Sequence, residues 1–402
     1  TGYGTQFDFT RHWQGMLKAD QSGLGIMVPV AAEIKKAVSI PVGAVTYMDP
    51  ARDPEFFESL IASGELDFIL MNRPLSVDYD YLHKLEEGRI DEIRPCTRCM
   101  HCHWDAADDG NLTFSCRTNA AHPFRFVTGQ LTGSYDPEPA ATAKNVVVVG
   151  AGPAGLEAAR VAAERGHSVT LYEKKGSVGG LLEFANNVKG PHENLSVLRS
   201  YFERQMEVLG VNVMLNTEAT ADIIAEASPD IVIAATGGVR DTLGLSDTAG
   251  TKVVGIDDFM MADIAEEVVI VGSNVQAIDA AMYLLAQGKH VQVVTPNAAS
   301  AIGAGHSFWV KTFTQPNMKA LGVRFWPEAT VTAVNDGSVT VKTATGIEQE
   351  IACGTVVEAL DCLPNDSLST GLSCEVVTVG DAARPFNIGE AICSGNAAAR
   401  AI

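Results

Sequence analysis

The chain has 402 residues, of which 46% are apolar, so it is long enough to bury the cores of about two to four domains. Its 29 lysines and arginines against 49 aspartates and glutamates give a formal net charge of −20 at pH 7. This acidity argues against nucleic acid or an anionic membrane as a partner, and it leaves open either an ordinary soluble surface or an acidic face that docks a redox protein. No apolar run reaches the roughly eighteen residues of a membrane span and no signal peptide opens the chain, so no membrane span is expected.

Residues 1–95 alternate between helical and strand-like patterns. Apolar spacing predicts helices at 25–38, 53–63 and 78–88, and short apolar runs predict strands at 39–45 and 67–71. The alternation is typical of the closing βα units of a parallel barrel, but a complete (β/α)8 barrel needs about 250 residues. We expect the missing strands, and with them the catalytic residues, in polypeptide that precedes Thr1, which is not an initiator methionine. A smaller arrangement is the alternative.

Three cysteines at two-residue gaps share one short loop, and a fourth follows after thirteen intervening residues: Cys96, Cys99, Cys102 and Cys116. Zinc sites usually use two separated pairs of cysteines, whereas a 4Fe-4S cluster takes one thiolate at each iron. The spacing therefore favours an iron-sulfur segment, with zinc or unliganded thiols as the alternatives. His101 and His103 are expected beside the metal rather than on it. Thiolate ligands and free cysteines such as Cys353 indicate a reducing compartment, the cytoplasm.

An acidic, proline-broken stretch at 135–141 predicts a domain boundary. A valine-rich strand at 145–149 then runs into Gly-Ala-Gly-Pro-Ala-Gly, and a helix of small residues and a second strand follow, ending at Glu173. Glycines allow a tight turn and the close approach of a pyrophosphate to a helix N-terminus. An acid about twenty residues further on accepts hydrogen bonds from ribose hydroxyls. The segment therefore predicts a dinucleotide or ADP site.

Three further turns are expected at the mouth of the same sheet, where ligands of open α/β folds bind. Gly179 and Gly180 follow the acid closely. An apolar strand at 230–234 ends in Ala-Thr-Gly-Gly, and another at 376–379 ends in Gly-Asp. Each of these is equally consistent with a strand followed by a plain turn.

A second nucleotide-binding fold is predicted inside the first. Its strand at 266–271, its turn, its helix at 278–287 and the strand that follows repeat the first motif, but Asn274 and Ala277 stand where glycines would be. No acid for a ribose follows, so the fold is expected while NAD(P)H binding stays open. Alternating apolar and polar residues at 322–359 predict antiparallel strands that complete this domain.

The chain is therefore predicted to be an α/β protein. It would contain the end of a (β/α)8 barrel, an iron-sulfur loop and two Rossmann-like nucleotide-binding domains, the second inserted in the first. The expected boundaries are 1–95 for the FMN-type barrel part, 96–135 for the 4Fe-4S cluster segment, 136–243 with 360–402 for the FAD/ADP-binding domain, and 244–359 for the inserted NAD(P)-binding-like domain.

The cysteine loop after barrel-like units, the GAGPAG turn with Glu173, the strand ends and the inserted second fold together resemble the multidomain old yellow enzyme family of iron-sulfur flavoproteins. Its members include 2,4-dienoyl-CoA reductase, 2-enoate reductases, trimethylamine dehydrogenase and dimethylglycine demethylase subunits. The resemblance covers nearly all of the chain, and the cysteine spacing is its most specific part. It implies an N-terminal barrel that holds FMN, a 4Fe-4S cluster beside it, and C-terminal domains that carry FAD or ADP and sometimes NAD(P)H.

Carried over by position, the resemblance implies three sets of residues. The cluster ligands would be Cys96, Cys99, Cys102 and Cys116. FMN would be contacted by Thr46, Asn72 and Arg73, with Arg73 meeting its phosphate, although many relatives have arginine where Thr46 stands. The FAD or ADP contacts would be Gly150, Gly152, Pro153, Ala154, Glu173, Lys174, Gly180, Leu181, Ala219, Ala235, Thr236, Gly237, Gly380 and Asp381.

The resemblance leaves the direction of electron flow open. The altered second nucleotide motif is similar to the amine dehydrogenase branch. That branch implies an N-methyl amine dehydrogenase or demethylase that oxidises a small-molecule substrate at FMN and passes electrons through the cluster to an electron-transfer flavoprotein. The alternative is an NAD(P)H-dependent 2-enoate or 2,4-dienoyl-CoA reductase. A third reading is an electron-transfer subunit, and a homo-oligomer or membership of a larger complex is expected.

Overall fold

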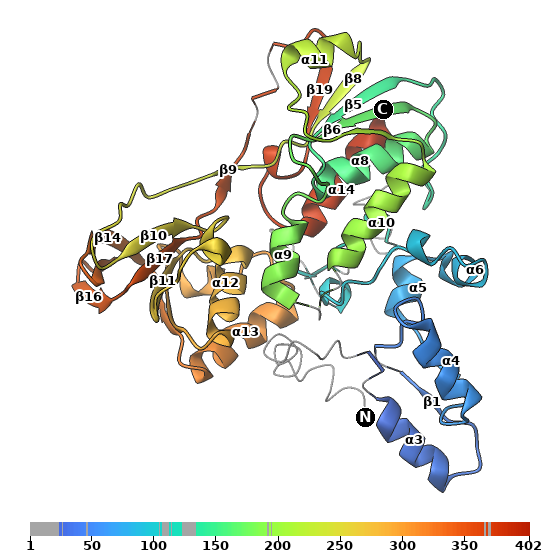
Figure 1. Ribbon diagram of the computed structural model, residues 1–402, viewed down its shortest axis with the longest axis horizontal. Helices are drawn as coiled ribbons and strands as arrows, with labels where there is room; N and C mark the ends of the chain where they lie inside the picture. Colours follow the sequence, from blue (N-terminus) through green and yellow to red (C-terminus); the bar gives the residue numbers. More distant parts are fainter. Residues whose placement is uncertain are drawn as a thin grey trace.

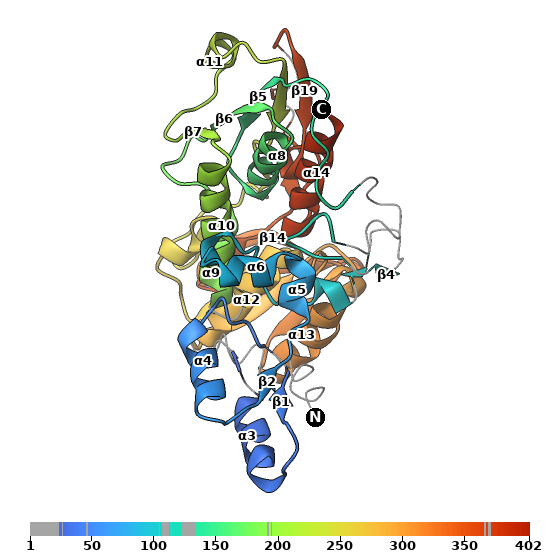
Figure 2. The same cartoon turned by 90° about the vertical axis from the view of Figure 1, so that its right-hand side faces the viewer.

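Two parallel sheets dominate the computed structural model (Figure 1). The N-terminal segment lies at one end of the molecule, the first sheet lies at the other, and the cysteine loop lies between them, as Figure 2 shows. The described residues are 24–25, 27–45, 47–103, 105–106, 112–113, 115–122, 134–190, 193, 195–365, 367–368 and 371–402. Within these ranges, no helix has both the length and the apolar character needed to cross a membrane.

The N-terminal segment contains one parallel strand pair with helices around it. Its elements are α3 Val28–Ala37, β1 Gly43–Ala44, α4 Pro54–Ala62, β2 Phe68–Ile69, α5 Arg73–Val77, α6 Tyr81–Glu86 and η1 Ile90–Glu92. β1 and β2 pair in parallel and α4 connects them, as in consecutive βα units of a barrel. The Asp53 side chain accepts a hydrogen bond from the Phe56 amide at 3.0 Å and caps α4. Each predicted helix and strand is present in a shorter form, the strands with two residues each, and α5 and η1 were not predicted.

The first large sheet has the strand order β19-β8-β5-β6-β7, and all its strands are parallel. Its elements are β5 Asn145–Val149, α8 Pro153–Glu164, β6 Ser168–Tyr172, α9 Leu182–Lys189, α10 Leu195–Val208, β7 Asn212–Met214, α11 Ala221–Glu226, β8 Ile231–Ala234, β19 Glu375–Thr378, η6 Gly380–Ala382 and α14 Ile388–Ala401. β5 is central and its four valines are buried, which explains their uninterrupted run. A Cβ at Gly395 would lie 2.1 Å from the Ala154 carbonyl oxygen, so α14 packs closely on α8.

The second large sheet is also parallel, with the order β10-β17-β11-β12-β13. Its elements and those packed on it are β10 Lys252–Gly255, η4 Phe259–Met261, β11 Glu267–Val271, α12 Val275–Ala286, β12 His290–Val294, η5 Ala299–Ala301, α13 Phe308–Ala320, β13 Arg324–Trp326 and β17 Thr355–Glu358. A separate antiparallel sheet consists of β14 Ala329–Asn335, β15 Ser338–Thr343 and β16 Glu348–Ala352. The prediction of antiparallel strands throughout 322–359 was therefore right for β14 to β16 and wrong for β13 and β17.

The chain crosses between the two large sheets twice. It leaves the first sheet through β9 Val239–Arg240 and returns through β18 Cys362–Leu363, and these two short strands pair antiparallel (Figure 1). A second link joins α9 to α12, where Lys189 Nζ lies 2.8 Å from an Asp279 carboxylate oxygen and both side chains are buried. The two sheets are thus joined by backbone on one side and by a buried ion pair on the other.

A buried ion cluster ties the cysteine segment to the first sheet. Glu157, on α8, is fully buried and accepts hydrogen bonds from Arg160 at 2.8 Å and Arg94 at 3.2 Å. Arg94 also donates to the Thr118 carbonyl oxygen at 2.5 Å, and Asn396 on α14 donates to Glu157 at 2.8 Å. Burial alone would raise the pKa of Glu157, but the charges of Arg160 and Arg94 outweigh it and lower this pKa to about 2.

We expect Glu157→Gln to lower the free energy of unfolding by about 3 kcal/mol or more, because two buried guanidinium groups lose their counter-charge. In the parent protein this stabilisation is complete above the ordinary carboxyl pKa of 4.5 and is lost as the pH falls toward the folded value of about 2. Urea unfolding at neutral pH and at about pH 3 measures both effects. The exposed control Glu348→Gln should cost less than about 0.5 kcal/mol. Equal losses in the two variants would contradict this account.

Candidate functional site

The four predicted cluster ligands lie in the segment between η1 and the acidic linker, and their thiols interact electrostatically with one another. Cys96 and Cys116 are buried and pack against Val77, while Cys99 and Cys102 are partly buried. Burial raises the pKa of the Cys96 thiol to about 11 and also raises the pKa of Cys102 and of Cys116, and other cysteines of the set raise each of these values further. Burial and the neighbouring cysteines thus oppose ionisation of these thiols. A metal centre would overcome this effect, because metal coordination deprotonates thiols.

A set of four cysteines is the donor set that iron-sulfur clusters use. Among the described residues, no group of three or more histidine, cysteine, aspartate or glutamate side chains is arranged to hold a metal ion. A cluster is larger and takes one thiolate at each iron. Burial opposes ionisation of Cys99, but the charges of Arg117 and His101 outweigh it and lower the pKa of this thiol. The side chain of His103 lies outside the described part.

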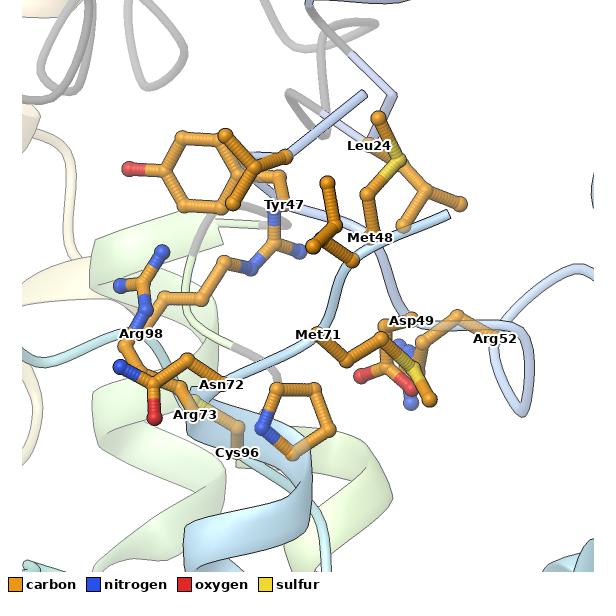
Figure 3. Close-up of a pocket in the computed structure, with 13 residues that line it drawn as sticks. Leu24, Tyr47, Met48, Asp49, Arg52, Met71, Asn72, Arg73, Cys96 and Arg98 are labelled. Carbon is orange, nitrogen blue, oxygen red and sulfur yellow. The ribbon is translucent and has the colours of Figure 1, made fainter. Parts of the chain in front are cut away.

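A cavity of about 180 Å³ opens beside the cysteine loop (Figure 3). Its walls come from the ends of β1 and β2, the start of α5 and the loop itself, so that Cys96 borders it. The guanidinium carbons of Arg73 and Arg98 lie 4.9 and 5.2 Å from the centre of the Tyr47 ring. Two cations on one aromatic ring make the cavity positive, which suits the phosphate of FMN.

Two of the three predicted FMN contacts line this cavity. Asn72 is the N-cap of α5 and Arg73 is its first residue, so both follow β2 rather than ending it. Thr46 lies outside the described residues. Sequence reasoning missed Tyr47 and Arg98, which both have left-handed backbones with φ of 54° and 55°. Arg98 lies inside the first Cys-x-x-Cys, and a positive φ in a large side chain is a feature of functional sites that only the structure reveals.

The glycines after β5 have separate roles. Gly150 has a left-handed φ of 100°, and a Cβ there would lie 2.3 Å from the Ala235 carbonyl oxygen. A Cβ at Gly155 would lie 1.9 Å from the Gly150 carbonyl oxygen, so both residues are needed for backbone packing. Gly152 differs, because it caps α8 and no described atom lies within 4 Å of its ideal Cβ position. Open space thus faces the N-terminus of α8, where a pyrophosphate binds in such folds.

Polar groups follow the ends of three strands of the first sheet. Glu173, after β6, accepts hydrogen bonds from the amides of Ala151 at 2.8 Å and Lys175 at 2.9 Å. Thr236 follows β8, and its Oγ1 is buried without a hydrogen-bond partner among the described residues. Asp381 follows β19, and burial raises its pKa. Since parallel strands end at one edge, these groups share the edge where ligands bind, and the buried hydroxyl of Thr236 fits a hydrogen bond to a ligand.

Four other predicted dinucleotide contacts gather at the start of α8. Pro153 is its first residue, where a missing amide hydrogen costs nothing. A Cβ at Gly180 would lie 3.0 Å from the Gly152 Cα, and a Cβ at Gly380 would lie 2.7 Å from the Ala154 Cβ. These residues bring the turn after β6 and the turn after β19 against the glycine turn after β5.

The structure gives the last five predicted contacts different surroundings. Ala235 is buried directly after β8, and Gly237 has a left-handed φ of 77°. Lys174 is exposed to solvent. Leu181 packs against the apolar core of the second sheet, and Ala219 packs against a small cluster on the other side of β5. Ala235 and Gly237 thus lie at the end of a strand. The contacts described here for Lys174, Leu181 and Ala219 do not connect these residues to the open space at the N-terminus of α8.

The second nucleotide fold has an asparagine, Asn274, at the corresponding position. Asn274 caps α12 with φ −71° and ψ −178°, close to φ −76° and ψ 178° for Gly152 at α8. Its side-chain oxygen accepts a hydrogen bond from the Ala277 amide at 2.9 Å, and its side-chain nitrogen donates to Asp361 at 3.0 Å. A backbone bridge to Ala304 lies at the same turn. The asparagine therefore occupies the helix terminus with its own side chain, where the first fold presents open space.

Comparisons with known proteins agree with this geometry. Residues 144–381 match the family model described as pyridine nucleotide-disulphide oxidoreductase. An NADH oxidase of Thermoanaerobacter brockii is 36% identical over 285 residues, which are 69% of this chain and 42% of that protein. A probable N-methylproline demethylase of Rhizobium meliloti is 35% identical over 283 residues, 67% of this chain and 39% of that protein.

Among solved structures, 2-naphthoyl-CoA reductase in complex with 2-naphthoyl-CoA superimposes with a TM-score of 0.80 at 30% identity. The match covers 94% of this chain and 57% of that one. The chain thus spans less than two thirds of the length of each of these proteins.

Proposed function

Because the chain belongs to the multidomain old yellow enzyme family of flavin-dependent oxidoreductases, we propose that it carries the electron path of such an enzyme. The path would link FMN in the Arg73 cavity to a 4Fe-4S cluster on the four cysteines, while FAD or ADP would bind at α8. The observation that carries the proposal is that Cys96 borders the cavity that Arg73 and Arg98 make positive. A proposed cluster ligand and a proposed phosphate-binding cation thus line the same cavity.

The chain's own residues would bind and orient these groups. Arg73 offers a planar fork of donors to a phosphate, and Asn72 lies beside it at the start of α5. A bound flavin supplies two-electron transfer and a cluster supplies one-electron transfer, which together couple a two-electron substrate to a one-electron acceptor. Gly152 leaves room for a pyrophosphate, and Thr236 offers a hydrogen bond to it or to the attached ribityl chain.

The finer proposal is an N-methyl amine dehydrogenase or demethylase whose electrons leave to an electron-transfer flavoprotein. Asn274 supports this direction, because its side chain occupies the helix terminus that a pyridine nucleotide would need in the second fold. The similarity to a probable N-methylproline demethylase agrees with it.

A second candidate is an NAD(P)H-dependent reductase of an activated alkene. The similarity over 94% of the chain to a reductase solved with an aromatic acyl-CoA favours it, as does the similarity to an NADH oxidase. In that scheme electrons would enter at the second nucleotide fold and leave at the FMN cavity. An electron-transfer subunit without its own barrel is the remaining alternative, and a complete barrel upstream in the same polypeptide would remove it.

Anaerobic stopped-flow mixing of the full-length, flavin-loaded protein separates the two directions. We expect neither NADH nor NADPH to bleach the flavin absorbance rapidly, because Asn274 closes the second nucleotide site. N-methylated amines such as N-methylproline and dimethylglycine should bleach it, and dithionite serves as the control for full reduction. Rapid bleaching by either nucleotide would instead establish the reductase direction and remove the amine proposal.

A further inference from the structure

A line of buried charges begins beside the cysteine loop. Arg117, the neighbour of Cys116, donates to the Thr97 hydroxyl at 2.9 Å and forms an ion pair with Glu193. A second carboxylate oxygen of Glu193 lies 3.4 Å from the Lys189 ammonium at the end of α9. The side chains of Arg117 and Glu193 are each 7% exposed, and that of Lys189 is 3% exposed. The carboxylate of Glu193 thus holds the Arg117 guanidinium next to the thiol loop. Lys189 in turn pairs with Glu193.

The line continues into the second nucleotide fold. Lys189 also pairs with Asp279 on α12 at 2.8 Å, and His306 Nε2 lies 3.3 Å from the same Asp279 oxygen. Burial lowers the pKa of His306, so the imidazole is neutral at neutral pH. The line therefore carries two cations, Arg117 and Lys189, against two carboxylates, Glu193 and Asp279.

The charged groups in this line interact strongly because they are buried away from water. Two unit charges interact several times more strongly in a protein interior than in water, and salt screens buried charges poorly. The charge of Arg117 lies at the loop, because this residue follows Cys116 directly and its guanidinium donates to Thr97, between Cys96 and Cys99. A cluster on these thiols gains one negative charge on reduction, so the field of this charge would favour its reduced state.

We propose that Arg117, held by Glu193, is a positioning residue that sets the reduction potential of a cluster bound at the four cysteines. The balanced charges through Lys189 to Asp279 then fix how much of the Arg117 field the cluster experiences. This inference rests on the proposed cluster, but it concerns residues outside the ligand set and outside both nucleotide sites. It makes the second fold part of the electrostatic environment of the cluster.

The test is a redox titration of the full-length, iron-loaded protein followed by the visible absorbance and electron paramagnetic resonance of the cluster. Glu193→Gln leaves Arg117 uncompensated, and we expect the one-electron reduction constant to rise about tenfold, which is about 59 mV. Arg117→Gln removes the cation nearest the loop and should shift the potential in the opposite direction. Asp279→Asn also removes one negative charge, but farther along the line from the thiol loop. It should therefore raise the potential by a smaller amount than Glu193→Gln.

Two controls separate a charge effect from damage. Glu348→Gln makes the same charge change on the exposed antiparallel sheet and should leave the potential unchanged. Iron content per chain, measured for each variant, shows that the cluster is retained. Retained iron with an unchanged potential in Glu193→Gln, or an upward shift in Arg117→Gln, overturns this inference while the proposed cluster stands. Absence of iron from the parent protein overturns both.

Discussion

Replacing Cys99 with serine is expected to remove the bound iron and the broad visible absorbance of the cluster together. Cys99 is the thiol of the set whose pKa is lowered, since the charges of Arg117 and His101 outweigh burial there. A hydroxyl is a harder donor, and iron-sulfur clusters select soft thiolates. The parent protein should contain about four irons per chain, and the variant should contain fewer than about one. Elemental analysis and absorbance spectra of anaerobically purified protein measure both.

Cys374→Ser is the matched control for this substitution. Cys374 is another partly buried free cysteine, and it packs against the small apolar cluster beside β8, away from the thiol loop. It should keep the full iron content and the parental spectrum. Full iron in Cys99→Ser would show that the four thiols are not one ligand set. Zinc without iron in the parent protein would remove the electron relay from the proposed function.

Gly152→Val is expected to fold and yet lose the bound dinucleotide. The backbone of Gly152 has an ordinary φ of −76°, and open space surrounds its ideal Cβ position. A valine there avoids strain but fills the space at the N-terminus of α8 and loses at most about 1 kcal/mol of capping energy. We expect less than about a tenth of the parental FAD or ADP content, which corresponds to about 1.4 kcal/mol or more of lost binding. Mass spectrometry of ligands released on denaturation measures the content.

Gly155→Ala provides the contrasting variant. Its Cβ would lie 1.9 Å from the Gly150 carbonyl oxygen, so this smaller substitution should damage the packing of α8 on β5 and lower the melting temperature strongly. The two variants thus separate a binding role from a packing role within one motif. Normal dinucleotide content in a folded Gly152→Val protein would show that the ligand does not bind at this helix terminus.

The sequence predicts those parts of the fold that local chemistry determines. The valines of β5, the glycines after it and the short spacing of the cysteines each restrict the backbone strongly, and the structure has the expected elements there. Strand direction in 322–359 was predicted less well, because it depends on distant partners. β17 lies between β10 and β11, although its residues pair with positions 103 residues earlier in β10 and 87 residues earlier in β11, and no local pattern specifies that position.

The candidate site shows the same division between local and distant chemistry. Cysteine spacing predicted the thiols, and the resemblance to the family predicted Asn72 and Arg73 as FMN contacts. Tyr47 and Arg98 were missed because their roles arise from a shared cavity between separate segments. The charges of Arg117 and Glu193 were missed for the same reason, since seventy-six positions separate the two residues along the chain.

The paired strands β9 and β18 are the backbone connections between the two large sheets, so a rotation of one sheet relative to the other would bend the chain there. Lys189 and Asp279 oppose that rotation, because pulling them apart would strand two opposite charges in surroundings from which water is excluded. The ion pair therefore favours one orientation of the two sheets. A rotation of one sheet relative to the other would first require water to reach the Lys189 ammonium and the Asp279 carboxylate.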